Sequence, residues 1–220
     1  MPSRRVIGLQ VTLDRFDVVG TDGDQVGFIR HAGLAAHAGE HDREAVAVYE
    51  MAPPLRAPGK TPVDSCGTAG LTDDEARKIQ VFIDLHANEH EAIKGLSRDN
   101  LPRCYTVLPH ATPFREDDGR FTRMRFSCAG FVIEAFRKAR ITLVVDEALP
   151  SVDLDLIKRA YSDYARFLDV EDFRESMGLS GSGPWPVMFC GYLFQALNQA
   201  PAAIRQAPYS PKRGDEIFGG

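Results

Sequence analysis

The sequence predicts an α+β fold, with paired strands in its N-terminal part and separate amphipathic helices after them. Two observations support this class. Short segments with a two-residue period lie beside polar turn-forming stretches, and longer segments with a 3.6-residue period follow helix-capping residues. Strands and helices do not alternate regularly, as they would in a parallel α/β sheet. With 220 residues, the chain is long enough for one domain with a substantial core.

Three segments near the N-terminus are predicted strands. Residues 6–13 alternate between apolar and polar side chains, and residues 26–36 and 44–52 are mainly apolar. The polar stretch 37–43 would join the last two strands as a hairpin. Residues 53–71 are rich in Pro and Gly, which predicts a long loop.

A helix is predicted from Thr72 to about Gly95. The sequence Thr-Asp-Asp-Glu at its start forms a capping box, in which the side chains of Thr72 and Glu75 bond each other's backbone N–H groups. One stripe along this helix is apolar apart from two histidines, and we expect it to face the core. The stripe consists of Ile79, Phe82, Ile83, His86, His90 and Ile93.

The rest of the chain predicts three more strands and several helices. The predicted strands are 104–108, 121–126 and 141–145. After a helix that begins at Cys128, a serine cap at Ser151 precedes a helical stripe over 154–168. A short helix is predicted at 170–177, and another at 187–199 after a break rich in Gly and Pro. The last 20 or so residues contain three prolines and are expected to be extended. We therefore expect a domain of residues 1–150, with residues 151–220 as a helical extension and tail packed on it.

Composition and charge exclude several classes of protein. The net charge of −5 is spread along the chain without a basic stripe, which argues against a nucleic-acid-binding protein. The longest apolar run, 187–194, is too short for a transmembrane segment, and the N-terminus has no secretory signal pattern. The expected location is therefore the cytoplasm. No cofactor is predicted, and the widely spaced cysteines would remain thiols in a reducing compartment.

A cysteine lies at the start of the helix that begins in the segment Phe-Ser-Cys-Ala-Gly-Phe-Val-Ile-Glu-Ala-Phe-Arg-Lys-Ala. Ser127 is a good N-cap, which places Cys128 at the first helical position. The apolar residues three, four, seven and eight positions later share its face. One interpretation is a small buried hydrophobe. The other is a nucleophile whose thiolate is stabilised by the positive end of the helix dipole.

The predicted hairpin supplies the partners that a cysteine nucleophile needs. His31 lies in one strand and Glu50 in the next, and neighbouring antiparallel strands can bring the two side chains together on one face. The imidazole of His31 would activate the thiol, while the carboxylate of Glu50 would orient the ring.

Three segments together resemble the circularly permuted papain-like cysteine enzymes. They are His-Ala-Gly-Leu-Ala from His31, Val-Tyr-Glu-Met-Ala-Pro around Glu50, and the helix that begins at Cys128. That group includes permuted NlpC-like peptidases and the lecithin retinol acyltransferase family. The resemblance implies an antiparallel sheet packed on helices, with Cys128 as nucleophile, His31 as base and Glu50 as orienting residue. It also implies a peptidase, amidase or acyltransferase that acts on a peptide, acyl or other small-molecule substrate through a thioester.

A competing interpretation is a zinc site. Residues 86–90 match the pattern H-x-x-E-H, in which His86 and His90 would bind the metal and Glu89 would act as base. Glu134 and Glu147 are candidates for the third ligand. A further alternative is a non-catalytic binding module with the same fold.

Two other groups of residues are interpreted as structural. Cys190 opens another apolar segment, and the residues Met188 and Phe189 before it favour a core position. Arg120, Arg123 and Arg125 are interpreted as a solvated strand face.

Overall fold

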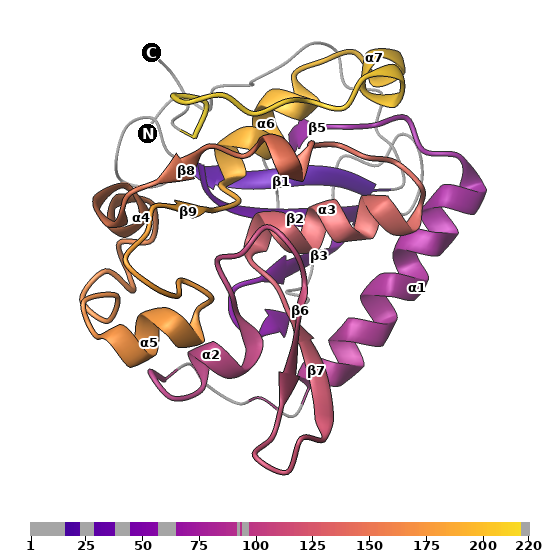
Figure 1. Ribbon diagram of the computed structural model, residues 1–220. Helices are drawn as coiled ribbons and strands as arrows, with labels where there is room; N and C mark the ends of the chain where they lie inside the picture. The colour runs from indigo at the N-terminus through magenta and orange to yellow at the C-terminus, as the bar shows by residue number, and fades with distance from the viewer. Residues whose placement is uncertain are drawn as a thin grey trace, which may run out of the picture.

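The structure is a computed structural model that describes residues 16–22, 29–37, 45–56, 65–91, 93 and 97–216. These residues form a mixed α+β structure with small antiparallel sheets, which confirms the predicted fold class (Figure 1). The predicted strand at residues 6–13 lies outside the described residues.

The central sheet contains the two strands of the predicted hairpin. Its order is β4-β3-β2-β1-β5, and neighbouring strands are antiparallel. The strands are β1 (Phe16–Asp22), β2 (Ile29–His37), β3 (Ala45–Met51), β4 (Leu55–Arg56) and β5 (Ser65–Gly67). The pairing of β2 with β3 confirms the hairpin, while β4 and β5 lie within the segment predicted as a loop.

Helix α1 (Asp73–His90) begins as predicted. Thr72 is its N-cap and forms a capping box with Glu75. The stripe predicted to face the core is buried at Ile79, Phe82, Ile83, His86 and His90. The helix ends at His90, a turn earlier than predicted.

Helix α3 (Cys128–Lys138) lies across the central sheet (Figure 1). It contacts β2 and β3 on one side and α1 and α6 on others, so most of its side chains are buried. The hydroxyl of Ser127 accepts a hydrogen bond from the backbone N–H of Gly130, which confirms the predicted cap. Cys128 is therefore the first residue of a helix enclosed on several faces.

The segment before α3 differs in part from the prediction. Residues 121–126 form a strand as predicted, β7 (Phe121–Arg125), which pairs with β6 (Thr112–Arg115). The strand predicted at 104–108 is wrong, since Cys104 ends a short helix, α2 (Leu101–Cys104), and Tyr105 forms only an isolated bridge with Phe126. Proline is compatible with the first turn of a helix, and Pro102 occupies that turn in α2.

The C-terminal part is helical, with some differences from the predicted pattern. The elements are η1 (Asp146–Ala148), β8 (Ser151–Val152), α4 (Leu154–Ala160), α5 (Glu171–Ser176), β9 (Trp185–Pro186), α6 (Cys190–Leu197) and α7 (Pro201–Gln206). Asp153, rather than Ser151, caps α4, and the turn of α7 occurs where an extended tail was predicted. The strand predicted at 141–145 is also wrong, because Val144 makes only an isolated bridge to Tyr209.

One hydrophobic core joins the two parts of the chain. Its buried residues extend from Phe16 in β1 to Ile204 in α7. Helix α6 contacts β2, β5 and α3, so residues beyond position 150 pack directly against the N-terminal sheet. Among the described residues, no helix has both the length and the apolar character needed to cross a membrane.

Candidate active site

His31 and Glu50 meet on one face of the central sheet. In the register of β2 and β3, Glu50 pairs with Gly33, and His31 is two residues from Gly33 and therefore on the same face. His31 Nε2 and Glu50 Oε2 are 2.9 Å apart. A side chain at Gly33 would crowd this pair, since a Cβ there would lie 2.9 Å from the carbonyl oxygen of Tyr49 and 3.2 Å from the Cβ of Glu50.

Arg56 on β4 extends the interaction from the other side of Glu50. Its Nη2 and Nε atoms each lie 2.8 Å from Glu50 Oε1, while Oε2 faces His31. The two carboxylate oxygens therefore have different partners. This arrangement fixes the carboxylate plane and holds it toward the imidazole.

The thiol of Cys128 completes the predicted group. The Cys128 and His31 side chains are hydrogen-bonded to each other, which brings the first turn of α3 to the face of the sheet that carries Glu50. The structure thus brings together three side chains that the sequence places at positions 31, 50 and 128.

The proton equilibria of the three groups favour a charged pair. Burial opposes the protonated form of His31, but hydrogen bonds and charges of Cys128 and Glu50 outweigh it and raise its pKa from 6.5 to about 10. A hydrogen bond with Cys190, followed by the interaction with His31, lowers the pKa of Cys128 well below its usual value despite burial. The interaction with His31 also lowers the pKa of Glu50. Together these shifts favour a thiolate on Cys128 beside an imidazolium on His31.

Two further side chains contact the sulfur of Cys128, and sequence reasoning did not assign either to the site. The Sγ atom of Cys190 lies 3.4 Å from Cys128 Sγ, and the hydroxyl oxygen of Tyr105 lies 3.8 Å away. Burial and the neighbouring Cys128 charge raise the pKa of Tyr105, so its hydroxyl remains protonated and can donate to the thiolate. Cys190 is buried as the sequence predicted. Its position at the start of an apolar helix, like that of Cys128, was the available signal for a second role.

The sulfur is enclosed, and the site is open to solvent mainly at the histidine. Cys128 is 2% exposed, whereas the side chains of His31 and Glu50 are 21% and 14% exposed. Access to the sulfur from solvent is therefore through the His31 side and requires displacement of the atoms that cover Cys128.

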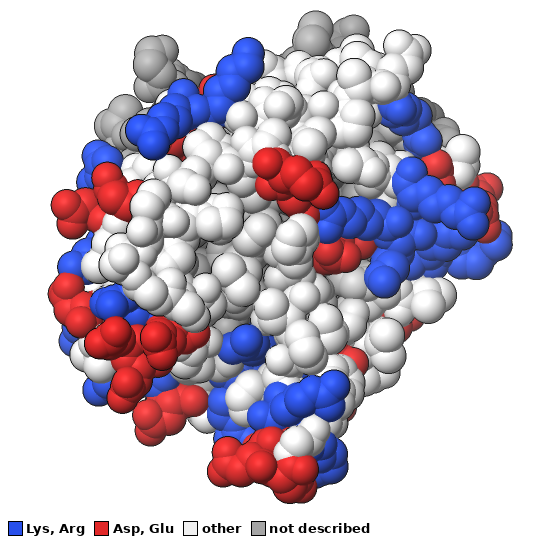
Figure 2. Space-filling view, viewed as in Figure 1, with Lys and Arg blue, Asp and Glu red and all other residues white. Residues whose placement is uncertain are grey.

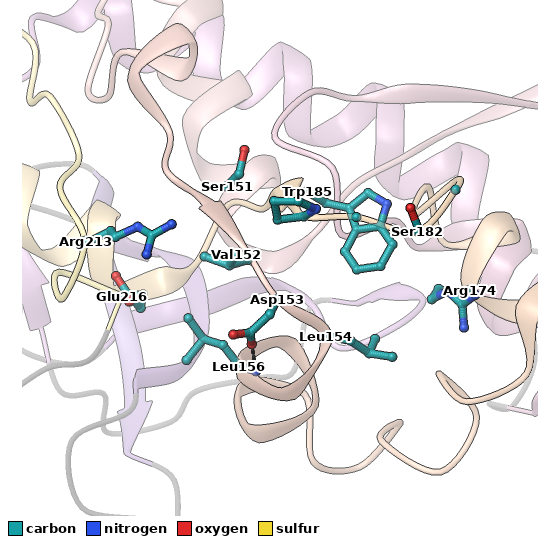
Figure 3. A pocket seen from close by; sticks show the side chains of 13 residues that line it. Ser151, Val152, Asp153, Leu154, Leu156, Arg174, Ser182, Trp185, Arg213 and Glu216 are labelled. Atoms are coloured by element: carbon teal, nitrogen blue, oxygen red, sulfur yellow. Dashed lines mark hydrogen bonds between the residues drawn. The ribbon is translucent and has the colours of Figure 1, made fainter.

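Two cavities occur elsewhere on the molecule. The one shown in Figure 3 has a volume of about 570 Å³; Trp185 and Ser182 lie toward one end and Arg213 and Glu216 toward the other. Its lining residues do not include Cys128 or its partners. This cavity belongs to the β8–β9 region rather than to the candidate active site.

The second cavity, of about 720 Å³, lies along α1 and α3. Phe82 and Leu85 contribute to its apolar wall, and Lys78 and Lys138 to its basic rim. Figure 2 shows Lys and Arg side chains gathered on the right-hand side of the molecule, in the region of α1 and the end of α3. The residues that line this cavity do not include Cys128, His31 or Glu50.

The two histidines of the H-x-x-E-H pattern are used in structural contacts. His90 accepts a hydrogen bond from the backbone N–H of Leu55 at Nδ1 and donates one to the carbonyl oxygen of Met124 at Nε2, so both ring nitrogens have partners. His86 Nδ1 lies 2.8 Å from Glu89 Oε2, which also accepts from the N–H of Met124.

The candidate third ligands do not complete a zinc site. The carboxylate of Glu134 pairs with Arg137 at 2.7 Å, and Glu147 is exposed in η1. Within the described residues, no group of three or more His, Cys, Asp or Glu side chains has an arrangement suited to a metal ion.

The prediction of a solvated arginine face is wrong for two of its three members. Arg123 is buried, with 6% exposure, and Arg125 donates to the carbonyl oxygens of Pro102 and Ser176. Arg125 thus ties β7 to α2 and to the end of α5. Arg120 is exposed as predicted.

The charged pair predicts how Cys128→Ala changes the pH dependence of unfolding. Below pH 6.5 the unfolded chain holds protons on both the cysteine and the histidine, whereas the folded pair holds only the proton of His31. The stabilisation from the pair therefore declines as pH falls. Above pH 9.0 the cysteine of the unfolded chain loses its proton, while His31 of the folded protein keeps its own up to about pH 10. The stabilisation from the pair therefore also declines as pH rises. We expect the difference in unfolding free energy between the wild type and Cys128→Ala to be greatest between these values, with limits of about 1.4 kcal/mol per pH unit on each side.

Urea unfolding at a series of pH values measures this difference, and Cys104→Ala is a matched control. Burial raises the pKa of Cys104 to about 11, so replacing it changes only the alkaline side. A Cys128→Ala difference that stays constant below pH 6.5 would rule out the thiolate–imidazolium pair.

Comparisons of the chain with protein-family models, with curated proteins and with solved structures give no match.

Proposed function

We propose that this protein is a cysteine-dependent acyl-transfer enzyme. The observation that supports the proposal most strongly is the interaction of Cys128 with His31. The ring of His31 is in turn held by Glu50, whose Oε2 lies 2.9 Å from His31 Nε2. More specifically, it would be a hydrolase or acyltransferase of the permuted papain-like kind, which cleaves an amide or ester bond through a thioester. Residues 1–150 would carry the catalytic groups, and residues 151–220 would form the extension that packs against them.

The proposed first step is attack by the Cys128 thiolate on the carbonyl carbon of the substrate. His31 Nε2 lies against Glu50, so the proton on the other ring nitrogen is available to the leaving group. Loss of the leaving group gives a thioester on Cys128. Neutral His31 then removes a proton from water or from a second acceptor, whose attack releases the acyl group.

Two donors near the sulfur are suited to a developing oxyanion. The first turn of a helix directs backbone N–H groups and the positive end of the helix dipole toward a neighbouring negative charge, and Cys128 begins α3. The protonated hydroxyl of Tyr105, 3.8 Å from the sulfur, is a second candidate donor. Together they would stabilise negative charge on a carbonyl oxygen held beside the thiolate.

Activated acyl substrates test this proposal directly. We expect p-nitrophenyl esters of short and long acyl groups to give a burst of p-nitrophenol and an acyl adduct on the peptide that contains Cys128. Mass spectrometry of acid-quenched, fully reduced protein would locate the adduct. Peptide p-nitroanilides in a parallel series would then distinguish amide substrates from esters.

Matched variants control the experiment. Cys128→Ser removes the thiolate, and Cys104→Ser removes another buried thiol that lies elsewhere in the core. The first variant should lose both burst and adduct, while the second should retain them. A folded wild-type protein that forms no adduct with any ester or amide would instead support a non-catalytic module.

A further inference from the structure

The starts of two helices converge on one pair of sulfur atoms. Cys128 is the first residue of α3 and Cys190 is the first residue of α6, and these helices contact each other. The two Sγ atoms lie 3.4 Å apart and the residues are 2% and 6% exposed. A disulfide needs a sulfur separation of about 2.05 Å, so a movement of roughly 1.4 Å would join them.

A third cysteine in the same core shows that this arrangement is not general to the buried thiols. The Sγ of Cys104 contacts the carbonyl oxygens of Asn100 and Leu101, within or just before its own short helix. Burial raises the pKa of Cys104 to about 11, whereas the interactions with Cys190 and His31 lower that of Cys128. Cys128 thus has both the activating base and a second thiol beside it.

We propose that Cys128 and Cys190 form an oxidative modification site, at which hydrogen peroxide converts the two thiols to a reversible disulfide. The inference rests in part on the proposed function, because the same sulfur is the nucleophile in both reactions. It assigns Cys190 a role that acyl transfer does not require.

The first step oxidises Cys128. Its thiolate attacks one oxygen of hydrogen peroxide, an S–O bond forms and the O–O bond breaks. The departing hydroxide takes a proton from His31 and leaves as water, so Cys128 becomes a sulfenic acid. Hydrogen peroxide is only slightly larger than water, which suits a sulfur whose surroundings open mainly at the partly exposed His31.

The second step consumes Cys190. Its sulfur attacks the sulfenic sulfur of Cys128, the S–S bond forms, and the hydroxyl group leaves with the Cys190 proton as a second water. In total two thiols are oxidised to a disulfide, and one peroxide is reduced to two waters. The product removes the nucleophile reversibly, and a dithiol would restore it. It also prevents irreversible oxidation of Cys128 to the sulfinic acid.

The experiment uses the full chain, fully reduced and then freed of reductant. Hydrogen peroxide is added at a few equivalents, remaining thiols are blocked with N-ethylmaleimide, and intact mass and peptide mapping follow. Relative to the reduced and blocked protein, we expect two fewer N-ethylmaleimide additions together with a loss of about 2 Da, and a peptide pair linked through Cys128 and Cys190. Treatment with dithiothreitol before blocking should reverse both. Cys190→Ser should instead accumulate sulfinic acid on Cys128, and Cys104→Ser should behave as the wild type does.

Several results would overturn the inference. One is wild-type protein, folded by circular dichroism, in which Cys128 is unchanged by peroxide. Another is oxidation of Cys128 to sulfinic acid at the same rate with and without Cys190. If Cys190→Ser does not fold, peptide mapping of the peroxide-treated wild type decides by itself whether the disulfide between Cys128 and Cys190 forms.

The outcome is separable from that of the ester experiment. A 128–190 disulfide in a protein that no ester acylates would support the modification site and contradict the enzyme. An acyl adduct on Cys128, without a disulfide after peroxide treatment, would support the enzyme and contradict the modification site.

Discussion

His31→Gln is expected to slow the alkylation of Cys128 by iodoacetamide at pH 6.5 by about 100-fold. In the wild type, His31 helps keep the sulfur as a thiolate. Without the imidazolium, burial acts on Cys128 more nearly as it does on Cys104, where it raises the pKa to about 11. The smaller thiolate fraction outweighs the greater intrinsic reactivity of the more basic thiolate that remains.

Peptide mapping of alkylated protein gives the rate for Cys128 separately from those of the other cysteines. The wild-type rate should change little between about pH 6 and 8, while the His31→Gln rate should rise steeply over the same interval. His110→Gln is the matched control, since His110 pairs with Asp146 at 2.9 Å and its side chain is 59% exposed. Equal rates for wild type and His31→Gln at pH 6.5 would exclude activation by His31.

Phe131→Ala is expected to lower the free energy of unfolding by about 3–5 kcal/mol. Phe131 is fully buried one turn after Cys128, and its ring lies 5.5 Å from that of Phe82 and 5.7 Å from that of Phe126. Truncation leaves a cavity between α1, α3 and the end of β7, and also removes both ring contacts.

Urea unfolding at neutral pH measures this change, and Phe121→Ala provides the matched control. Phe121 is 43% exposed on β7, so we expect its truncation to cost less than about 1 kcal/mol. Similar losses for the two variants would contradict the placement of Phe131 in the shared core.

Local sequence signals predicted the elements that carry the candidate site. The cap at Ser127, the capping box at Thr72 and the β2–β3 pairing are each determined by residues close together in the chain. Because the side chains on a strand alternate, that pairing could bring His31 and Glu50 to one face, and the register of Gly33 with Glu50 decides that it does. The meeting of these residues with Cys128 is a long-range contact, and the expectation that they meet came from the family resemblance.

The errors arose where tertiary contacts decide the local structure. Residues 141–145 are rich in β-branched side chains, but Val144 forms an isolated bridge with Tyr209 instead of a strand ladder. Hydrophobic periodicity does not distinguish a buried irregular segment from a buried strand. Similarly, Arg123 and Arg125 were assigned to the solvent-exposed surface because charged side chains are usually exposed. No local signal indicated that other parts of the chain cover this side of β7.

The contact between Cys190 and Cys128 could not be predicted from the residues around either cysteine. Its apolar neighbours correctly predicted burial, but its closeness to Cys128 depends on how α6 packs on α3, across 62 residues of sequence. The common feature of the two cysteines is their position at the start of apolar helices. Comparing such positions with one another, rather than each with its neighbours, would have identified the pair.

The contact between α3 and α6 has a consequence for the order in which the protein matures. A ribosome adds His31, Glu50 and Cys128 well before Cys190, so a nascent chain that ends before α6 holds these three residues without the second cysteine. Chain termination or proteolysis ahead of α6 would leave Cys128 without the neighbour that contributes most to its acidity. Full acidity of that sulfur thus arises only after α6 has been synthesised and has packed against α3.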